Sequence, residues 1–464
     1  MSTGLAPTSL PPTIVRAARM PAGTPQVPVA VVGAGACGLT AAIFLREAGV
    51  DCVLLERDAQ PGGSTSLSSG FIPAAGTAAQ RAAGVADDSP ARLAEDIQHK
   101  ARGSAAPALV AAYTQAIVPA LDALQARHGL AFEVLDGFLY PGHTRLRMHT
   151  LAQRTGAALI AALDGAAQRA GAMLLTQAQV HELWCDGDER ILGLGYRRPD
   201  GQIEHLGCEM LLLACNGFGG NAALVDELLL PMRGAPFAGH AGNDGSAIAW
   251  GRALGAALAD LGGCQGHGSW VVPQGSLMTW AVMMEGGIQV NAHGERFHDE
   301  TAGYSEAAVE VLRQPGGVAW NLFDDRLLAL ARGFADFRDA EAAGALRSAG
   351  GAGPLAALIG CGAAVLAATL GATRLAPPYH AVKVTGALFH TQGGLDIDAH
   401  GRVLREDGTP LPNLLAAGGA ARGVSGNAVW GYLSGNGLLS AVAGGFIMAG
   451  TAARTPGRAT AGAA

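Results

Sequence analysis

Residues 27–58 read VPVAVVGAGACGLTAAIFLREAGVDCVLLERD, a strand followed by a glycine-rich turn, a helix and a second strand. The small and β-branched residues of 29–32 predict a buried parallel strand. A helix is expected from the glycine-rich turn to about Ala48. The apolar run 52–55 then predicts a second strand, which ends at Glu56. This order of elements is that of a unit that binds a dinucleotide.

Each glycine of this turn has a separate physical reason. Gly33 allows the tight turn, Gly35 lets the backbone approach a pyrophosphate, and Gly38 lets the helix pack on the strand. The N-terminus of the helix offers unpaired N–H groups and a partial positive charge to the phosphates. Glu56 follows the second strand, where its carboxylate can accept hydrogen bonds from ribose hydroxyls. A glycine motif alone is weak evidence, but here all the parts occur within about 30 residues.

Two later segments favour FAD over NAD as the dinucleotide. The glycine-rich loop 61–64 follows soon after Glu56 and is suited to pass under the phosphates of a flavin. Residues 209–220, EMLLLACNGFGG, resemble the second strand-to-turn motif of glutathione-reductase-type flavoproteins. The segment 360–362 lacks a third glycine and a following acidic strand, so a built-in NAD(P)H domain is not expected. We therefore expect electrons to pass to an external acceptor.

Composition indicates a compact globular protein. The chain has 464 residues, of which 49% are hydrophobic and 15% are charged, which is enough to form two domains with large cores. The net charge of -7 and the lack of a block rich in Lys and Arg argue against a nucleic-acid partner. Seven cysteines without a C-x-x-C pair predict reduced thiols in a cytoplasmic protein.

The ends of the chain are predicted to be flexible tails. Residues 1–26 are rich in Pro, Thr and Ala and lack the apolar core of a signal peptide, and residues 451–464 form the second tail. Apolar stretches such as 355–370 are interrupted by glycine and are shorter than a membrane span. We expect a soluble protein with no membrane span.

Seven motifs in order along residues 27–450 resemble the fumarate reductase / 3-ketosteroid Δ1-dehydrogenase superfamily of flavoproteins. They read VVGAGACGLTAA, PGGSTSLSSG, LLLACNGFGGN, GNDGSAIAWGRALGA, VNAHGERFHDE, ALFHTQGGLDID and LLAAGGAARGVSG. The resemblance implies an α/β fold, with a Rossmann-like, glutathione-reductase-type FAD-binding domain (27–264 and 390–450). An inserted α+β cap domain is expected at 265–389, with the active site between the two.

The resemblance also implies the cofactor contacts. No His lies between Gly63 and Ile72, where members with covalent FAD carry the attached residue, so FAD is expected to be bound non-covalently. The Glu that would bind the sugar chain of the flavin is replaced by Gly419. The residues expected to bind FAD are Gly33, Gly35, Ala36, Cys37, Gly38, Glu56, Arg57, Gly62, Gly63, Ser64, Ser69, Gly70, Val180, Ala214, Gly217, Asn243, Asp244, Gly418, Gly435, Asn436 and Leu438.

The substrate-binding residues match the reductases only in part. By resemblance, reductases hold a dicarboxylate with two His and two Arg, one Arg also donating the proton. His267 and His390 match the two His, but Tyr304 and Tyr432 stand at the Arg positions, and Trp280 replaces an acid that relays protons. Without a guanidinium there is no bidentate clamp for a carboxylate. Two tyrosines at these places are similar to the ketosteroid dehydrogenases.

That resemblance implies a reaction and a role for each residue. Tyr304 would remove an α proton, Tyr432 and a backbone N–H of residues 435–437 would polarise the ketone oxygen, and a hydride would go to flavin N5. His390 would be a second oxygen ligand or a support. The sequence leaves open that Tyr304 is an ordinary surface tyrosine and that Tyr432 simply packs against the flavin. The expected activity is desaturation of a small-molecule ring ketone, either a 3-ketosteroid or a cyclohexanone-type ring.

Two other functions stay open at this stage. A fumarate-reductase-like enzyme acting on an acid would need a carboxylate anchor, for which the sequence offers His267, His390, Arg422 or Arg147. A flavin-binding subunit that passes electrons within a complex is the other.

Two further segments contain histidine next to other polar residues. His143, Arg147 and His149 either line the cavity or belong to a solvated loop. His293 and its neighbours are better explained by a turn than by a metal site, so no metal is expected.

Overall fold

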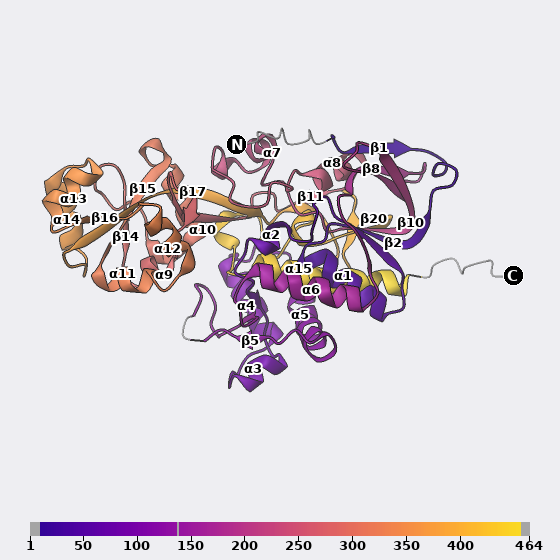
Figure 1. The fold of residues 1–464 in the computed structure, drawn as a ribbon, viewed down its shortest axis with the longest axis horizontal. Coiled ribbons are helices and arrows are strands. Elements are labelled where there is room, and N and C mark those ends of the chain that lie inside the picture. Colours follow the sequence, from indigo (N-terminus) through magenta and orange to yellow (C-terminus); the bar gives the residue numbers. More distant parts are fainter. Residues whose placement is uncertain (1–9, 137–138, 456–464) are drawn as a thin grey trace. The chain divides into compact units, whose positions relative to one another are not determined.

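A computed structural model describes residues 10–136 and 139–455 (Figure 1). The described chain divides into two compact units. The larger unit contains the residues up to Asn221, Gly239–Gly263 and the residues from Thr391 onward. The smaller unit contains Ala222–Ala238 and Cys264–His390. Parts of both predicted tails, 1–9 and 456–464, lie outside the described residues.

A five-stranded parallel sheet forms the centre of the larger unit. Its strands lie in the order β20 (Pro410–Ala416), β10 (Ile203–Leu213), β2 (Gln26–Val32), β3 (Cys52–Leu55) and β7 (Met173–Leu175). The strands β2, β3 and β10 are apolar runs because helices and loops cover both faces of a parallel sheet. The predicted α/β fold with a Rossmann-like core is confirmed.

Antiparallel strands extend this sheet beyond β10. The first half of β10 pairs with β9 (Ile191–Arg197), β9 pairs with β8 (Gln179–Cys185), and β19 (Arg402–Leu404) pairs with β20. Such an antiparallel extension next to a parallel sheet belongs to the predicted glutathione-reductase-type domain.

The N-terminal segment corrects one prediction. Residues 1–26 were expected to be a flexible tail, but Thr13–Arg16 form strand β1, which pairs in parallel with β8. β1 has only four residues, so it carries no periodic pattern, and its partner lies far along the chain. Three of these residues, Thr13, Ile14 and Val15, are β-branched, a composition that suits a strand.

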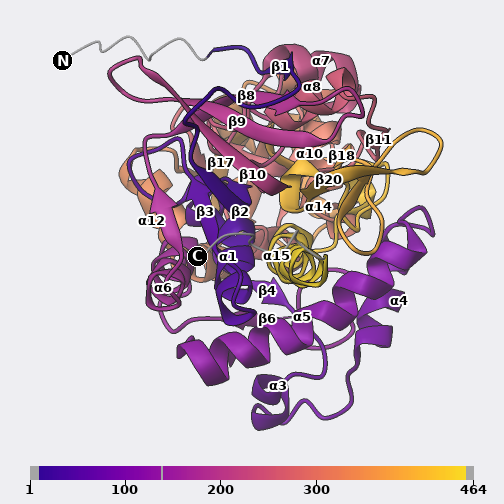
Figure 2. The same cartoon turned by 90° about the vertical axis from the view of Figure 1, so that its right-hand side faces the viewer.

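Four long helices pack on the larger unit. Helix α1 (Ala36–Glu47) and helix α15 (Asn436–Arg454) lie side by side against the sheet, and α5 (Pro107–His128) packs against α15 (Figure 2). Helix α6 (Gly156–Arg169) packs on α1. Helix α15 reaches Arg454, beyond the predicted domain end at residue 450, and it stops shortly before Pro456, since the residue before a proline disfavours the helical conformation.

Shorter elements complete the larger unit. They are α2 (Gly63–Ser66), α3 (Ala78–Ala82), α4 (Pro90–Lys100), α8 (Ser246–Ala253), the small sheet of β4 (Ile72–Pro73), β6 (Met148–Thr150) and β5 (Glu133–Val134), and the pair β11 (Leu258–Ala259) and β18 (Gly394–Leu395).

Helices α5 and α15 are both long and apolar enough to cross a membrane, judged by length and composition alone. In their most apolar stretches, 44% of α5 and 61% of α15 is buried within the protein. The two helices pack on each other, and α15 also packs on α1. Buried core helices pass the same test, so these helices are weak evidence for a membrane protein.

The smaller unit has its own sheet and its own hydrophobic core. The strands lie in the order β13 (Ser276–Leu277), β12 (Cys264–Val271), β17 (Tyr379–Thr391), β15 (Val318–Asp324) and β14 (Ile288–Val290), with β16 (Arg347–Ala349) beside β17. The helices are α7 (Ala222–Leu228), α9 (Ala281–Met284), α10 (Tyr304–Leu312), α11 (Asp325–Ala331), α12 (Ala335–Ala342), α13 (Ala352–Ile359) and α14 (Ala363–Gly371).

The smaller unit is more extended in sequence than the cap expected at 265–389. It also contains Ala222–Ala238, because Phe237 pairs with Leu388 and the Ala238 N–H donates to the Leu388 carbonyl at 2.8 Å. A pairing between segments about 150 residues apart in the chain has no local sequence signal.

Candidate functional site

Gly33 and Gly38 are required by the packing of the chain itself. Gly33 has φ +103°, and a Cβ there would lie 2.6 Å from the Ala214 carbonyl oxygen. A Cβ on Gly38 would lie 1.9 Å from the Gly33 carbonyl oxygen. Strands β2 and β10 and helix α1 therefore approach one another more closely than any side chain permits.

Gly35 is different, because no residue in the described part of the chain requires it to be glycine. Its φ of -80° suits any residue, and a Cβ would meet nothing nearer than Thr65 Oγ1 at 3.8 Å. The open space lies at the N-terminus of α1, where the Ala36 N–H reaches Thr65 Oγ1 at 3.3 Å. A space left free at the positive end of a helix fits a pyrophosphate.

Glu56 is buried and holds the glycine loop. One carboxylate oxygen accepts the Ala34 N–H at 2.8 Å and the other accepts the Asp58 N–H at 3.0 Å. Burial raises the pKa of Glu56, and the two backbone N–H groups act in the opposite direction. A carboxylate oxygen accepts more than one hydrogen bond, so both oxygens keep capacity for ribose hydroxyls. The Ala178 N–H donates to the Glu56 carbonyl at 2.8 Å, which brings the start of β8 and the predicted contact Val180 to this side.

Ser64 joins three segments that the sequence places far apart. Its Oγ accepts hydrogen bonds from Asn216 Nδ2 at 3.0 Å and from Asn243 Nδ2 at 2.8 Å. Next to it, Arg57 donates to Asp244 at 2.9 Å. The predicted contacts of the loop 61–64, the turn after β10 and the loop before α8 are thus brought together. Asn216 was missed by the sequence analysis.

The C-terminal contacts also converge on the glycine loop. A Cβ on Gly418 would lie 3.4 Å from the Cys37 Cβ, so the turn after β20 abuts the start of α1. Gly435 has φ +88° and precedes α15. Asn436 is fully buried, donates to Ser425 Oγ at 3.0 Å, and its Oδ1 has no hydrogen-bond partner among the described residues. An unsatisfied buried acceptor is expected where a ligand supplies the donor. Leu438 follows in the first turn of α15, half-buried.

Ser69 and Gly70 give weaker support. Ser69 is exposed, and a Cβ on Gly70 would lie 2.8 Å from the Thr155 carbonyl oxygen. Packing against the start of α6 therefore explains Gly70 without a cofactor.

Tyr432 lies beside the N-terminus of α15. It is 6% exposed, burial raises the pKa of its hydroxyl, and hydrogen bonds from the backbone N–H groups of Gly437 and Gly435 oppose that shift. The Tyr432 hydroxyl therefore accepts N–H groups of the segment 435–437, in which one backbone N–H was expected to polarise the ketone oxygen together with Tyr432. The imidazole of His143 hydrogen-bonds to the carbonyl of Ser434 in the same segment, with Nε2 2.9 Å from the oxygen.

The polar segment 143–149 is neither a solvated loop nor a source of free cations. His143, Arg147 and His149 are all buried. Arg147 is bound by Asp88 at 2.8 Å and by Asp96. Burial lowers the pKa of His143 to about 4, so this imidazole is neutral at neutral pH.

Tyr304, His267 and the end of β17 come together in the smaller unit. Tyr304 is the first residue of α10, and its ring stacks on the His267 ring with centroids 5.0 Å apart. His267 Nδ1 accepts the Ser269 N–H at 3.1 Å, which leaves Nε2 to carry the proton of the neutral ring. Burial lowers the pKa of His267 to about 3. The ring of Phe389, next to the half-buried His390, lies 5.7 Å from that of His267.

Trp280 closes the other side of His267. The two rings meet edge to face at 5.7 Å, and Trp280 Nε1 donates to the Glu300 carbonyl at 3.2 Å. An apolar ring thus occupies the place at which the reductases were expected to carry an acid.

The remaining carboxylate anchor suggested by the sequence is also engaged. Arg422 donates to Asp260 at 2.9 and 3.1 Å and to Asp396 at 2.9 Å. Each of the two candidate arginines, Arg147 and Arg422, is therefore paired with two aspartates.

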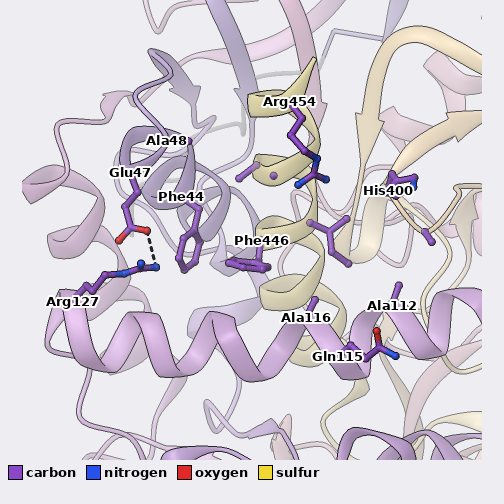
Figure 3. Close-up of a pocket in the computed structure, with 14 residues that line it drawn as sticks. Phe44, Glu47, Ala48, Ala112, Gln115, Ala116, Arg127, His400, Phe446 and Arg454 are labelled. Carbon is purple, nitrogen blue, oxygen red and sulfur yellow. Dashed lines mark ion pairs between the residues drawn. The ribbon is translucent and has the colours of Figure 1, made fainter. Parts of the chain in front are cut away.

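A groove of about 580 Å³ lies elsewhere in the larger unit (Figure 3). Phe44 and Phe446 meet edge to face at 4.7 Å, and Arg127 pairs with Glu47 at its rim. Phe44 and Glu47 lie in the last turn of α1, Phe446 lies in the middle of α15 and Arg127 near the end of α5, whereas the glycine loop and Tyr432 precede the N-terminal ends of α1 and α15. The groove is therefore separate from the cofactor site.

The cysteines take no part in this chemistry. All seven lie within the described residues, and none forms a disulfide. Burial raises the pKa of Cys37 and of Cys264 to about 12, so both thiols are protonated and unreactive. Within residues 10–136 and 139–455, no three His, Cys, Asp or Glu side chains gather as metal ligands.

Comparison with known proteins shows which proteins this chain is similar to. A family model described as an FAD binding domain matches residues 28–438. The "Probable fumarate reductase Ifc3" of Shewanella frigidimarina is 26% identical over 457 residues, which cover 94% of this chain and 76% of that protein. The 4-oxocyclohexanecarboxylate 2-dehydrogenase of Sinomonas cyclohexanicum is 27% identical over 516 residues, which cover 86% of this chain and 88% of that protein.

A solved structure shows the same fold. The 3-ketosteroid delta1-dehydrogenase from Sterolibacterium denitrificans aligns with a TM-score of 0.79 and 20% sequence identity over 93% of this chain and all of that one. The sheet, the glycine loop and these matches define an FAD-dependent oxidoreductase. The chain belongs to the family described as FAD binding domain, and its relatives include enzymes named as fumarate reductases and as a ring-ketone dehydrogenase.

Proposed function

We propose that this protein is a dehydrogenase that introduces an α,β double bond next to the carbonyl of a cyclic ketone, either a cyclohexanone-type ring or a 3-ketosteroid. The observation that carries the proposal is the contact between the Tyr432 hydroxyl and the backbone N–H groups of Gly435 and Gly437. Because these N–H groups donate to the Tyr432 oxygen, the phenol O–H is left to donate, and such a neutral donor suits a ketone oxygen that becomes an enolate. It does not provide the charged, bidentate contact that a carboxylate prefers.

The residues divide the reaction between them. When bound, FAD accepts the hydride that leaves the β carbon. Tyr432 donates a hydrogen bond to the ketone oxygen, and the positive end of α15 stabilises the negative charge that develops there. Tyr304 removes the α proton. Because Tyr304 is the first residue of α10, the positive end of that helix favours its phenolate.

The histidines have supporting roles. His267 is neutral and its ring stacks on that of Tyr304, which fixes the direction of the phenol. His390 lies at the end of β17, next to Phe389, whose ring packs on that of His267. We assign to His390 either a second contact to the substrate oxygen or a supporting role.

The electrostatics disfavour an acid as the substrate. His267 carries no charge at neutral pH, and Arg147 and Arg422 are each held by two aspartates. The relative named 4-oxocyclohexanecarboxylate 2-dehydrogenase supports a small ring ketone, although the compound in that name also carries a carboxylate, so the argument against an acid applies to a substrate held by its carboxylates alone. The relatives named fumarate reductases make fumarate the necessary comparison.

The test is anaerobic bleaching of the flavin absorbance of the purified protein. The panel contains cyclohexanone, a 3-ketosteroid and succinate, and dithionite-reduced protein is mixed with fumarate. Bleaching by a ketone supports the proposal and ranks the steroid against the small ring. Re-oxidation by fumarate without a response to either ketone would replace it with the reductase alternative.

We further propose that FAD is bound non-covalently, that the electron acceptor is an external molecule, and that the protein is cytoplasmic and spans no membrane. Acid precipitation tests the first point: a supernatant that contains all the flavin is expected, and a yellow pellet would indicate a covalent bond.

A further inference from the structure

Asn216 stands in a backbone conformation that favours glycine. It lies in the turn after β10, which ends at Leu213, and has φ +67°, in the left-handed region. Its side chain is held at both ends of the amide. Oδ1 accepts the Gly217 N–H at 2.9 Å, and Nδ2 donates to Ser64 Oγ at 3.0 Å. These two bonds fix the amide orientation beside the loop 61–64.

Gly419 lies against this amide. A Cβ added to Gly419 would be 2.1 Å from Asn216 Oδ1 and 3.0 Å from the Gly217 nitrogen. Any side chain at position 419 would therefore have to displace the Asn216 amide oxygen and disturb the hydrogen bond that this oxygen accepts from the Gly217 N–H. Position 419 is where the sequence analysis expected a Glu that reaches the sugar chain of the flavin. The asparagine at position 216 and a side chain at position 419 exclude each other.

The amide has unused hydrogen-bonding capacity. An asparagine side chain has two N–H donors and two acceptor lone pairs, of which one each is used in the bonds to Ser64 and Gly217. One donor and one acceptor remain, which is the set that binds a hydroxyl group. Asn216 is half-buried, so a ligand can reach it.

The neighbouring groups place this capacity in the cofactor site. Ser64 Oγ accepts from Asn216 and from Asn243, so both of its lone pairs are used and its own proton is left to donate. Gly418, next to Gly419, abuts Cys37 at the start of α1.

We propose that Asn216 binds the polyhydroxy chain of FAD in place of the carboxylate that is missing at position 419. A neutral amide on the turn after β10 takes over the contact, and Gly419 is glycine because the amide occupies its side-chain space. The two positions are therefore alternatives. Either an amide at position 216 or a carboxylate at position 419 binds the polyhydroxy chain, but not both.

The first test is Asn216→Gly, measured on apoprotein after removal of FAD. Glycine suits φ +67°, so the midpoint of thermal unfolding of the apoprotein should stay at or above the wild-type value. The dissociation constant for FAD, from quenching of flavin fluorescence, should rise roughly tenfold. The control is Glu189→Gly, which also removes a side chain at positive φ (+62°) but lies in the hairpin between β8 and β9. Wild-type affinity in Asn216→Gly would overturn the proposal.

The second test reverses the exchange. Gly419→Glu alone should lose FAD affinity or fold poorly, because the new side chain meets the amide. The double variant N216G/G419E should recover folding and bind FAD more tightly than N216G. A single G419E variant that folds and binds FAD as well as the double variant would contradict the mutual exclusion. If both variants that carry G419E fail to fold, the FAD affinity of N216G alone settles the question.

Discussion

Gly35 and Gly38 belong to one motif but have different physical roles, and two substitutions separate them. Gly35→Val should give a folded protein without FAD, because the side chain has room in the protein but fills the space left for the pyrophosphate. Gly38→Ala should lower the unfolding midpoint or prevent folding, because its Cβ would meet the Gly33 carbonyl oxygen. Flavin absorbance and circular dichroism of the purified variants measure both effects. A yellow Gly35→Val protein would contradict the nucleotide site.

Tyr304 can be tested against a second tyrosine of the same unit. Tyr304→Phe should keep the flavin spectrum and lower kcat for the ketone that bleaches the flavin by roughly 10² to 10⁴, the usual contribution of a general base. Tyr379→Phe, on β17, is the control and should keep wild-type turnover. Near-normal turnover of Tyr304→Phe would remove Tyr304 from the mechanism.

At this scale, the sequence selects residues that belong to a local motif, and their binding of FAD stays a prediction. The glycines of the first turn and Glu56 follow from a motif of about 30 residues, and their geometry agrees with it. Asn216 was not found, because its importance depends on a contact with Gly419, which lies far along the chain. An asparagine in a glycine-rich turn was the available signal, since asparagine tolerates positive φ.

Among the elements, those of the nucleotide-binding motif were predicted close to their observed bounds, and a short strand outside any motif was not. Helix α1 and strand β3 were expected to about Ala48 and at 52–55, and they occupy Ala36–Glu47 and Cys52–Leu55. Strand β1 was expected to be part of a tail, since four residues carry no period and its partner is β8. Pairing between distant segments is a tertiary effect that local propensity does not contain.

The segment β6 and helix α4 are joined by an ion cluster that should dominate the stability of this part. Arg147→Met would leave Asp88 and Asp96 buried without their partner and should lower the free energy of unfolding by about 3–5 kcal/mol. Arg145→Met, two residues away, removes an exposed pair with Asp87 and should cost about 0–1 kcal/mol. Urea unfolding of the two variants gives the comparison. Equal effects would mean that Arg147 is not structural and would reopen its role as a substrate anchor.

For the whole molecule, the sequence predicted an FAD domain with an inserted cap, and the description of two units agrees with the class of fold. The boundaries depend on which strands pair. Residues 222–238 join the smaller unit through the contact of Phe237 with Leu388. His390 ends the smaller unit in the structure, whereas the sequence analysis began the second FAD-binding segment there.

Two buried neutral histidines, one in each unit, should make the protein sensitive to acid. Burial lowers the pKa of His143 to about 4 and that of His267 to about 3, against about 6.5 in an unfolded chain. Between these values the unfolded chain binds a proton that the folded chain does not, so the free energy of unfolding falls as pH falls below about 6.5. The loss continues until about pH 4 for His143 and about pH 3 for His267, where the folded state also becomes protonated. By about pH 5, each histidine should cost about 2 kcal/mol.

Asparagine separates this effect from packing. His143→Asn can still donate to the Ser434 carbonyl, and His267→Asn can still accept the Ser269 N–H, but neither takes up a proton. At about pH 8 the histidines are neutral in both states, so any difference from wild type there measures packing alone. Between about pH 8 and pH 5, the unfolding midpoint of each variant should fall less than that of the wild type, and that of the double variant least. If the unfolding midpoints of the variants and the wild type fall in parallel as pH is lowered, the two histidines are not held neutral by the fold. That result would also contradict their placement beside the two tyrosines, since His143 bonds to the segment of Tyr432 and His267 stacks on Tyr304.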